Sequence, residues 1–252
     1  MREKIELNAE ALSLRNQLGV DSRSPIDVFA LLHNNPDLTL VFYPMSSGVS
    51  GICILDGINK IIGINSATTY GRQRFTIAHE LYHLFYNEGF TSIVCSVDLE
   101  ATKNVQEKEA DMFASFFLAP YESLVDFIRN KLKKDQLQLE VEDVVAIEQY
   151  FGLSRQATLC RLTNDKFLAY EKSESMKTGI IASAKKLGHS TNLYRPSLES
   201  DQYATYGKYI KAVESLKEKE LISYGKYDEL LLDGFRSDMV YESPQQNAGL
   251  YD

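Results

Sequence analysis

The 252-residue sequence has no excess of basic residues, no long apolar run and few cysteines. It carries 27 Lys and Arg against 35 Asp and Glu, a formal net charge of −8, whereas a nucleic-acid binder normally shows a basic excess. Direct nucleic-acid binding is therefore disfavoured. No apolar run approaches the roughly 18 residues that a transmembrane helix needs, and the charged start MREKIELNAE differs from an apolar signal segment. These absences predict a cytoplasmic protein that does not bind membranes.

The cysteines are too few and too scattered to organise the fold. Cys53, Cys95 and Cys160 are odd in number and widely spaced, so we expect neither a disulfide framework nor a cysteine-based metal site. We expect reduced thiols, with two or all three buried. A composition of 44% hydrophobic and 25% charged residues is typical of a globular protein with a substantial core.

Hydrophobic periodicity predicts an α+β fold with its strands early in the chain. Three β-rich runs lie at 38–43, 51–55 and 60–64, and Asp56–Gly57 is a hairpin signal between the last two. We therefore expect a small antiparallel sheet of about three strands. Helical spacing occurs on both sides of these runs, at 5–18, 26–32, 70–87, 105–117, 121–133, 140–150 and 154–162.

A short polar stretch, Glu171–Ser175, divides the chain in this interpretation. We expect it to be a linker between a first domain at 1–170 and a mainly helical C-terminal region at 171–252. That region contains a large share of the tyrosines but no recognisable motif. We predict a partner-binding or regulatory role for it.

The most informative motif is His79-Glu80-Leu81-Tyr82-His83, an H-E-x-x-H sequence inside the helical stretch FTIAHELYHLFY. Residues four apart lie on one face of a helix, so both imidazoles can bind one metal ion while Glu80 lies beside it to activate water. The simpler interpretation is a helix with two ordinary, partly buried histidines. The motif uses two of only four histidines, and we favour the metal site.

A catalytic zinc ion also needs a third protein ligand and an open position for water. Glu107 and Asp111 are one helical turn apart, so Glu107 can bind the metal while Asp111 hydrogen-bonds the far nitrogen of a ligand histidine. Glu109 is the competing ligand, but it projects about 200° around the helix from Glu107. An acidic first turn favoured by the helix dipole would explain the charges without the spacing. We favour Glu107 as the ligand.

Two blocks of sequence together resemble the ImmA/IrrE-type zinc metallopeptidases. They are RQRFTIAHELYH at 72–83 and EKEADMFASFFLAP at 107–120, with weaker similarity at 151–162 and at Ser50–Gly51. The resemblance covers roughly residues 5–165. It implies a zincin-like fold in which the sheet packs on the active-site helix, followed by a helical subdomain at about 140–165. It also implies His79, His83 and Glu107 as ligands of one Zn²⁺ per chain, with Glu80 as general base.

The resemblance further implies the biological role. Members of this family are commonly linked to mobile elements or stress responses, where they cut a helix-turn-helix repressor. We therefore expect an endopeptidase whose protein substrate is such a repressor, with strands 51–64 offering an edge to an extended peptide. Manganese, cobalt or iron would also fit two imidazoles and a carboxylate. The oligomeric state stays open.

Two other functional interpretations compete with the peptidase. One is a non-catalytic antirepressor or toxin–antitoxin protein that keeps the fold for binding. Retention of both histidines, Glu80 and Glu107 argues against it. The other is a purely structural zinc site, which would want a fourth protein ligand, usually cysteine. Cys95 lies between the two ligand blocks, and we give little weight to a ligand or switch role for it.

Several other residues have weaker claims on function. Tyr82 stands where the family often has Gly, so it either contributes a hydroxyl to oxyanion or substrate binding or packs in the core. Arg72 and Arg74 precede the motif and either clamp substrate, pair with carboxylates or lie solvated. Residues 151–165 are similar to the turn and second helix of a helix-turn-helix, but the acidic balance argues against DNA reading.

Overall fold

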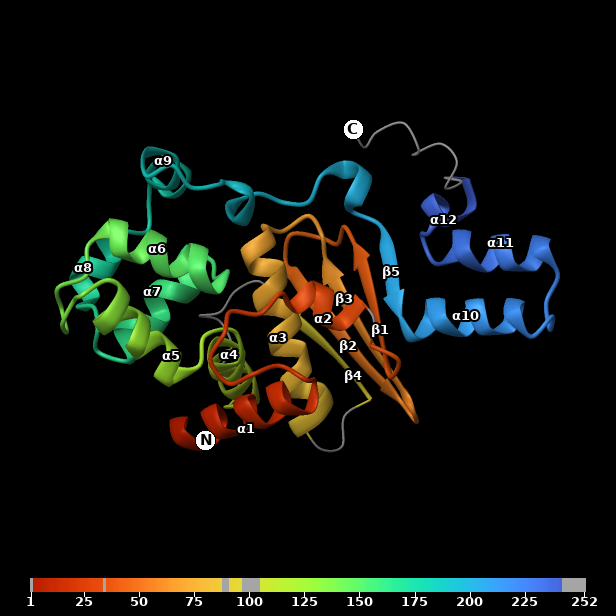
Figure 1. The fold of residues 1–252 in the computed structure, drawn as a ribbon, viewed down its shortest axis with the longest axis horizontal. Helices are drawn as coiled ribbons and strands as arrows, with labels where there is room; N and C mark the ends of the chain where they lie inside the picture. The colour runs from red at the N-terminus through yellow and green to blue at the C-terminus, as the bar shows by residue number, and fades with distance from the viewer. Residues whose placement is uncertain (1, 34, 88–90, 97–104, 242–252) are drawn as a thin grey trace.

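The computed structural model describes residues 2–33, 35–87, 91–96 and 105–241 (Figure 1). The α+β class is confirmed: a sheet formed mainly by the first hundred residues packs against helices. No helix among the described residues is both long and apolar enough to cross a membrane. The first helices are α1, Lys4–Gln17, and α2, Val28–His33.

The sheet has five strands in the order β4-β2-β3-β1-β5, two more than we expected. They are β1 Leu38–Tyr43, β2 Val49–Asp56, β3 Asn59–Asn65, β4 Ser92–Ser96 and β5 Ala204–Gly207. The hairpin between β2 and β3 forms as predicted, with Asp56 opposite Asn59. The sheet is mostly antiparallel, but β1 and β3 run parallel. The sheet departs from the expected antiparallel arrangement only at this pair among the described strands, because no hairpin connects β1 directly to β3.

The two unexpected strands are short and lie at the two edges of the sheet. β4 has the sequence SIVCS, whose consecutive apolar residues lack the alternation of a half-buried strand, and Val94 is 62% exposed. β5 is only four residues long and comes from the C-terminal region to pair with β1. Since β2 and β3 are each paired on both sides, strands 51–64 offer no free edge. The expected docking edge at 51–64 is therefore wrong, and among the described strands β4 is the free edge on that side.

The central helix is α3, Tyr70–Tyr86, which contacts β2 and β3 on one side and α4, Val105–Leu118, on another. Nearly every residue from Gly71 to Leu84 is buried, as expected for a helix packed on several sides. α1 covers the outer side of α4. This packing places both of the motif-bearing helices inside the protein.

The expected helix at 121–133 is divided into α5, Tyr121–Asp126, and a π-helical turn at Phe127–Lys131. The helix-turn-helix-like segment follows as α6, Val141–Phe151, and α7, Arg155–Asn164. Gly152 ends α6 in the left-handed conformation with φ 69°, and the Ser154 side chain caps α7 by accepting from the Ala157 backbone N–H.

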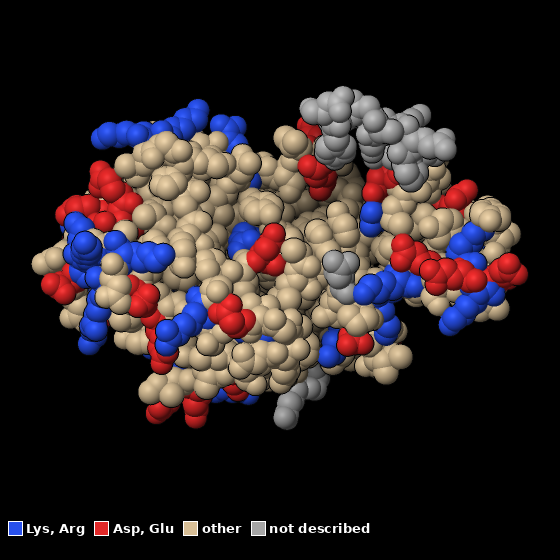
Figure 2. All heavy atoms as spheres, viewed as in Figure 1, with Lys and Arg blue, Asp and Glu red and all other residues tan. Residues whose placement is uncertain are grey.

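The basic residues of α7 face the protein interior. Arg155 and Arg161 are 2% and 5% exposed, and they pair with Glu148 and Asp165. These side chains cannot contact nucleic acid without unfolding their surroundings. On the face of the molecule seen in Figure 2, basic and acidic side chains are interspersed and form no continuous basic stripe.

The C-terminal region is built of short helices, plus β5. The expected linker Glu171–Ser175 is wrong: these residues lie in α8, Tyr170–Ser175, which packs against α7. Ser173 is buried there, so this polar stretch forms one side of the interface between α8 and α7. The remaining elements are α9 Ile180–Lys186, 3-10 turns at Asn192–Tyr194 and Glu199–Asp201, α10 Lys208–Glu218, α11 Tyr224–Asp233 and α12 Ser237–Tyr241.

The C-terminal region also secures the start of α3. Backbone N–H of Tyr70 donates to the Arg195 carbonyl, and the buried Gln73 amide donates to the carbonyls of Ser66 and Thr68. Ser66 in turn donates to the Gln202 carbonyl. The N-terminal end of the motif-bearing helix is therefore fixed by contacts from residues more than a hundred positions away.

Candidate metal centre

The two histidines of the H-E-x-x-H motif meet on one face of α3. His79 and His83 are 7% and 0% exposed, and their Nε2 atoms are 3.2 Å apart. Their spacing of one turn within a helix produces this proximity locally. The simpler interpretation, two unrelated core histidines, does not explain why both Nε2 atoms converge on one point.

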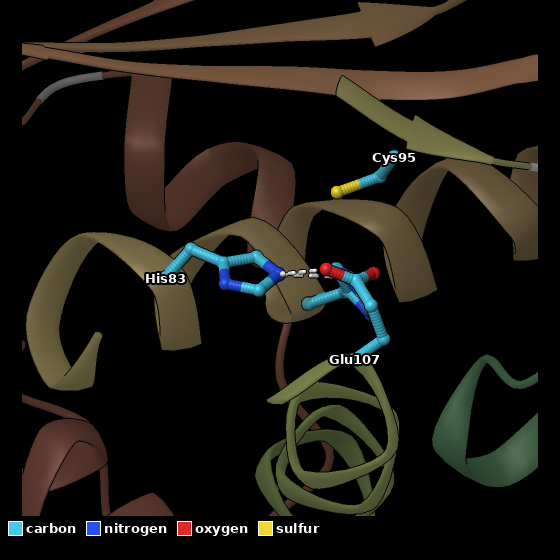
Figure 3. A group of neighbouring side chains, drawn as sticks. His83, Cys95 and Glu107 are labelled. Carbon is cyan, nitrogen blue, oxygen red and sulfur yellow. Dashed lines mark hydrogen bonds and ion pairs between the residues drawn. The ribbon is translucent and has the colours of Figure 1, made fainter. Parts of the chain in front are cut away.

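Glu107 completes a triangle of donor atoms from the first turn of α4. Its Oε2 lies 3.2 Å from His79 Nε2 and its Oε1 lies 3.4 Å from His83 Nε2 (Figure 3). Glu109 points elsewhere, accepting hydrogen bonds from the Tyr82 hydroxyl at 2.7 Å and the Arg2 backbone N–H at 2.6 Å. The structure thus brings Glu107, and not Glu109, to the histidines.

The outer nitrogens of both rings have partners that orient them. Asp111 Oδ1 lies 2.9 Å from His79 Nδ1, and the Asn87 side-chain amide lies 3.3 Å from His83 Nδ1. A carboxylate can only accept, so a neutral His79 carries its proton on Nδ1 and leaves Nε2 as the atom that can bind a cation. Asp111 therefore fixes the tautomer of His79 that binds a cation. Asn87 was not identified from the sequence.

Electrostatics at this site favour positive charge. Hydrogen bonds with His79 and His83 hold the pKa of Glu107 well below its usual range. Burial lowers the pKa of His79, but hydrogen bonds with Asp111, Cys95 and Glu107 outweigh it and hold that pKa well above its ordinary value. Both shifts show that the carboxylates Glu107 and Asp111 stabilise positive charge where the imidazoles meet. A metal cation would experience the same field.

The spacing of the three donor atoms fits a single small cation. Ligand atoms about 2.0–2.2 Å from one ion at tetrahedral angles are separated from each other by about 3.3 Å. The three distances among His79 Nε2, His83 Nε2 and the Glu107 carboxylate are 3.2, 3.2 and 3.4 Å. Two imidazole nitrogens and one carboxylate oxygen also form the donor set of many catalytic zinc sites.

Glu80 is a second indication of a binding site, because its carboxylate is buried without a hydrogen-bond partner among the described residues. The residue is 0% exposed, and neither side-chain oxygen has a hydrogen-bond partner among the described residues. Burial raises its pKa to about 7. A buried polar atom without a partner costs roughly 1–3 kcal/mol, so its retention points to a role outside folding.

Gly51 on β2 makes room for the Glu80 side chain. A Cβ atom at Gly51 would come within 2.8 Å of Glu80 Oε1 and 2.6 Å of the Thr76 methyl carbon. The strand can therefore approach α3 at this point only because residue 51 has no side chain. The sequence had singled out Ser50–Gly51 by resemblance alone, and the close approach gives the physical reason.

A fourth donor, the thiol of Cys95, lies at the same centre. The ligand atoms of His79, His83, Cys95 and Glu107 all lie within 4.8 Å of one another. Cys95 comes from β4 with its sulfur turned toward His83 and Glu107 (Figure 3). Its residue is 2% exposed. In the sequence, the only signal for Cys95 is its position between the two ligand blocks, which is too weak to predict a ligand.

The other cysteines lie apart from this group. Cys53 is buried and Cys160 is exposed, so the expectation that at least two thiols are buried is confirmed. Cys53 Sγ contacts the Glu80 backbone carbonyl at 3.9 Å, whereas Cys160 lies on α7.

Two of the residues proposed to contact substrate do not reach the cluster. Tyr82 is buried, its hydroxyl donates to Glu109, and its ring packs 5.5 Å from that of Phe113. These contacts fit the core-packing alternative, and a role of Tyr82 in oxyanion or substrate binding stays a prediction. Arg74 is also buried and donates to the carbonyls of Gly152 and Ile26. It joins α3 to the end of α6, away from the metal ligands.

Arg72 remains close to the candidate centre. It is half-buried, and burial lowers its pKa while the charges of Asp111 and Cys95 oppose that change. A cavity of about 460 Å³ lies nearby between α4, α7 and α8, with Asp111 in its wall. None of His79, Glu80 or His83 lines this cavity. The cavity therefore borders the site at Asp111, behind the proposed metal ligands.

Comparison with known proteins agrees with this geometry. A search of curated proteins finds no match to the chain. The family model described as Peptidase_M78, IrrE N-terminal-like domain, matches residues 23–163. That span includes α3, α4 and four of the five strands, and ends at α7. Because the match covers more than half of its length, the chain belongs to the M78 peptidase family, the IrrE-like proteins that the two motif blocks resemble.

Proposed function

We propose that this chain is a zinc-dependent endopeptidase whose metal ligands are His79, His83 and Glu107. The observation that carries the proposal is the convergence of those donor atoms beside the unpartnered Glu80 carboxylate. Membership of a peptidase family supports peptide hydrolysis as the reaction. Zinc is proposed over manganese, cobalt or iron because two imidazoles and a carboxylate in a buried site suit it well.

In this mechanism Glu80 moves the proton. A bound divalent cation would supply Lewis acidity, which polarises the scissile carbonyl and makes a water molecule easier to deprotonate. Glu80 accepts that proton as the water oxygen attacks the carbonyl carbon, and then donates it to the leaving nitrogen. One water is consumed, and the products are a carboxylic acid and an amine.

The remaining residues hold the reacting groups in place. Asp111 fixes the His79 tautomer through the 2.9 Å contact with Nδ1. Gly51 allows β2 to approach α3 closely beside the Glu80 side chain. Arg72 is proposed as a contact for the substrate, because it is the basic side chain that interacts with Asp111.

We propose that the substrate adds as an extended strand to β4. Among the described strands, β4 pairs only with β2 and leaves its other edge free, and it carries Cys95 at the metal centre. Strand addition would place a flexible peptide segment across the donor atoms. By family resemblance, a helix-turn-helix repressor of a mobile element or stress response is the proposed source of that segment.

The C-terminal region, residues 171–252, is proposed as a partner-binding or regulatory part. It exposes several large apolar side chains, among them Leu198 at 72%, Leu221 at 66% and Tyr224 at 77%. Such side chains mark a surface that meets other proteins where they form a contiguous patch.

Metal content per chain tests the proposed site directly. Purified wild type, Glu107→Ala and Glu109→Ala proteins are supplied with zinc and measured by elemental analysis. We expect about one zinc per chain in wild type and Glu109→Ala, and loss in Glu107→Ala, because only Glu107 faces the histidines. A wild type that binds no metal would refute the hydrolytic mechanism.

Cleavage of a candidate repressor tests the substrate. The zinc-loaded protein is incubated with a purified helix-turn-helix repressor encoded next to its gene, and fragments are identified by mass spectrometry. We expect one cut in a flexible segment. A repressor that is inactivated without being cut would instead favour the non-catalytic antirepressor function.

A further inference from the structure

We propose that Cys95 is a fourth ligand that closes the metal centre and holds the peptidase in a latent form. This inference rests on the proposed metallopeptidase function and adds a means of control to the same site. A catalytic zinc site normally has three protein ligands and one open position, whereas four protein ligands close it. Cys95 would occupy the position that water needs.

The position of the sulfur supports this assignment. Cys95 Sγ belongs to a group of four donor atoms within 4.8 Å of one another, and the other three have the spacing of ligands on a single ion. The thiol also lies close enough to His79 and Glu80 to interact electrostatically with both, without a hydrogen bond to the Glu80 carboxylate. The sulfur is therefore close to both the proposed general base and the other donor atoms.

Thiol chemistry makes Cys95 a strong ligand. Thiolate sulfur binds zinc tightly, and a coordinating thiol gives up its proton to the surroundings. When the Cys95 thiol binds the metal, one proton is released per chain. The buried position of Cys95 keeps water from competing for the fourth place.

The local structure of β4 aims the residue at the centre. The register between β2 and β4 shifts between Val49 and Gly51, and Gly51 lies opposite Cys95. Ser50, the extra residue, donates from its hydroxyl to the Cys95 carbonyl at 3.1 Å. Such irregularities in strand pairing re-aim side chains and are common beside active sites.

Release of Cys95 is mechanically simple because β4 is an edge strand. Its backbone is held on one side only among the described strands, so it can separate from the centre with less disruption than β2 or β3. The edge that we propose for substrate is on the same strand. A partner peptide that pairs with β4 would therefore be able to draw the sulfur away and open the metal centre.

The unpartnered Glu80 carboxylate distinguishes a latent catalytic site from a purely structural one. A structural zinc site has no use for a buried carboxylate with both oxygens unsatisfied beside its ligands. A catalytic site needs that group as its base once the fourth position opens. A metal centre that is closed to water but can become catalytic requires four ligands and an available general base. Both are present here.

Cobalt substitution of the full chain tests the ligand assignment without any assay of activity. Co²⁺ bound by a thiolate shows a sulfur-to-cobalt charge-transfer band in the near ultraviolet, and its visible bands report the coordination. The proteins are wild type, Cys95→Ser, Cys95→Ala, and two matched controls: Cys53→Ser at a buried thiol on β2 and Cys160→Ser at an exposed one.

We expect the charge-transfer band in wild type and in both controls, and its loss in the Cys95 variants while cobalt stays bound. The affinity for zinc should fall in Cys95→Ser by at least the roughly ten- to hundredfold that loss of an outer-shell partner costs. Peptide cleavage by Cys95→Ser should be faster than by wild type, because the fourth position is open.

Other outcomes separate the two proposals. Wild type that binds one Co²⁺ without a charge-transfer band would overturn the role of Cys95 and leave the three-ligand peptidase intact. Wild type that binds no Co²⁺ or Zn²⁺ would overturn the proposed function, and this inference with it. The wild-type spectrum decides the question even if the Cys95 variants fail to fold.

Discussion

Two regions of this molecule bury charged side chains, and they treat them in opposite ways. In the helical subdomain, Glu148 and Arg155 are 0% and 2% exposed and form an ion pair. Arg155 also donates to the Met176 carbonyl and the Ser183 hydroxyl, and Tyr194 donates to Glu148 at 2.7 Å. At the candidate metal centre, the equally buried Glu80 has no hydrogen-bond partner among the described residues.

The difference separates residues that hold the fold together from residues kept for binding. The Glu148–Arg155 network joins α6 and α7 to α8, α9 and the turn at Asn192–Tyr194, so its charges are fully satisfied by protein. The donor atoms of His79, His83 and Glu107 instead converge on one another at 3.2–3.4 Å. A buried charge with every partner present indicates structure, and one without partners indicates a site.

The largest expected effect is the loss of catalysis in Glu80→Gln. Without a general base the cleavage rate should fall by about 10²–10⁴, while metal content and unfolding midpoint stay near wild type because Gln fills the same space. Steady-state cleavage, elemental analysis and thermal unfolding measure the three quantities. Glu109→Gln is the matched control. Full cleavage by Glu80→Gln would refute the assignment of the base.

Next is the loss of stability in Glu148→Leu. Removing one partner of a buried ion pair leaves Arg155 uncompensated and should lower the free energy of unfolding by about 3–5 kcal/mol, without removing the metal. Chemical denaturation measures this free energy of unfolding. The double variant Glu148→Leu, Arg155→Met should recover most of the loss, whereas Lys226→Ala, which breaks an exposed pair with Glu229, should change little. Loss of metal in Glu148→Leu would contradict the separation of the two regions.

Gly51→Ala probes the contact between β2 and the base. The added methyl would meet Thr76 and Glu80 at under 3 Å, so unfolding free energy should fall by about 1–3 kcal/mol and cleavage should fall with it. Gly48→Ala is the control, since a Cβ there meets nothing within 4 Å. Thermal unfolding and cleavage are measured on both. Equal behaviour of the two variants would show that the close approach at Gly51 is unimportant.

The smallest expected effect is that of Asp111→Asn. An amide in place of the carboxylate weakens the hold on His79 Nδ1, so zinc affinity should fall roughly ten- to hundredfold with little change in stability. Competition with a chelator measures the affinity. Lys108→Gln, an exposed change on the same helix, should leave it unaltered. An unchanged affinity in Asp111→Asn would mean that Asp111 does not orient the ligand.

The sequence could predict those parts of the site that depend on residues close together in the chain. His79 and His83 are four residues apart in one helix, so their convergence follows from helical geometry alone. The same argument placed Asp111 one turn from Glu107 and separated Glu109 from both. Tyr82 and Arg74 were open to several interpretations, because the direction in which a helix face points depends on what packs against it.

The sequence by itself determined the class of fold, the hairpin at Asp56–Gly57, the motif-bearing helices and the family. Each of these depends on patterns within a few turns of helix or one strand. Only the tertiary structure decided that β4 and β5 complete the sheet, that Gly51 admits the Glu80 side chain, and that Cys95 reaches the metal centre. These relations join elements far apart in the chain, and packing of the whole core, with no local signal in the sequence, brings them together.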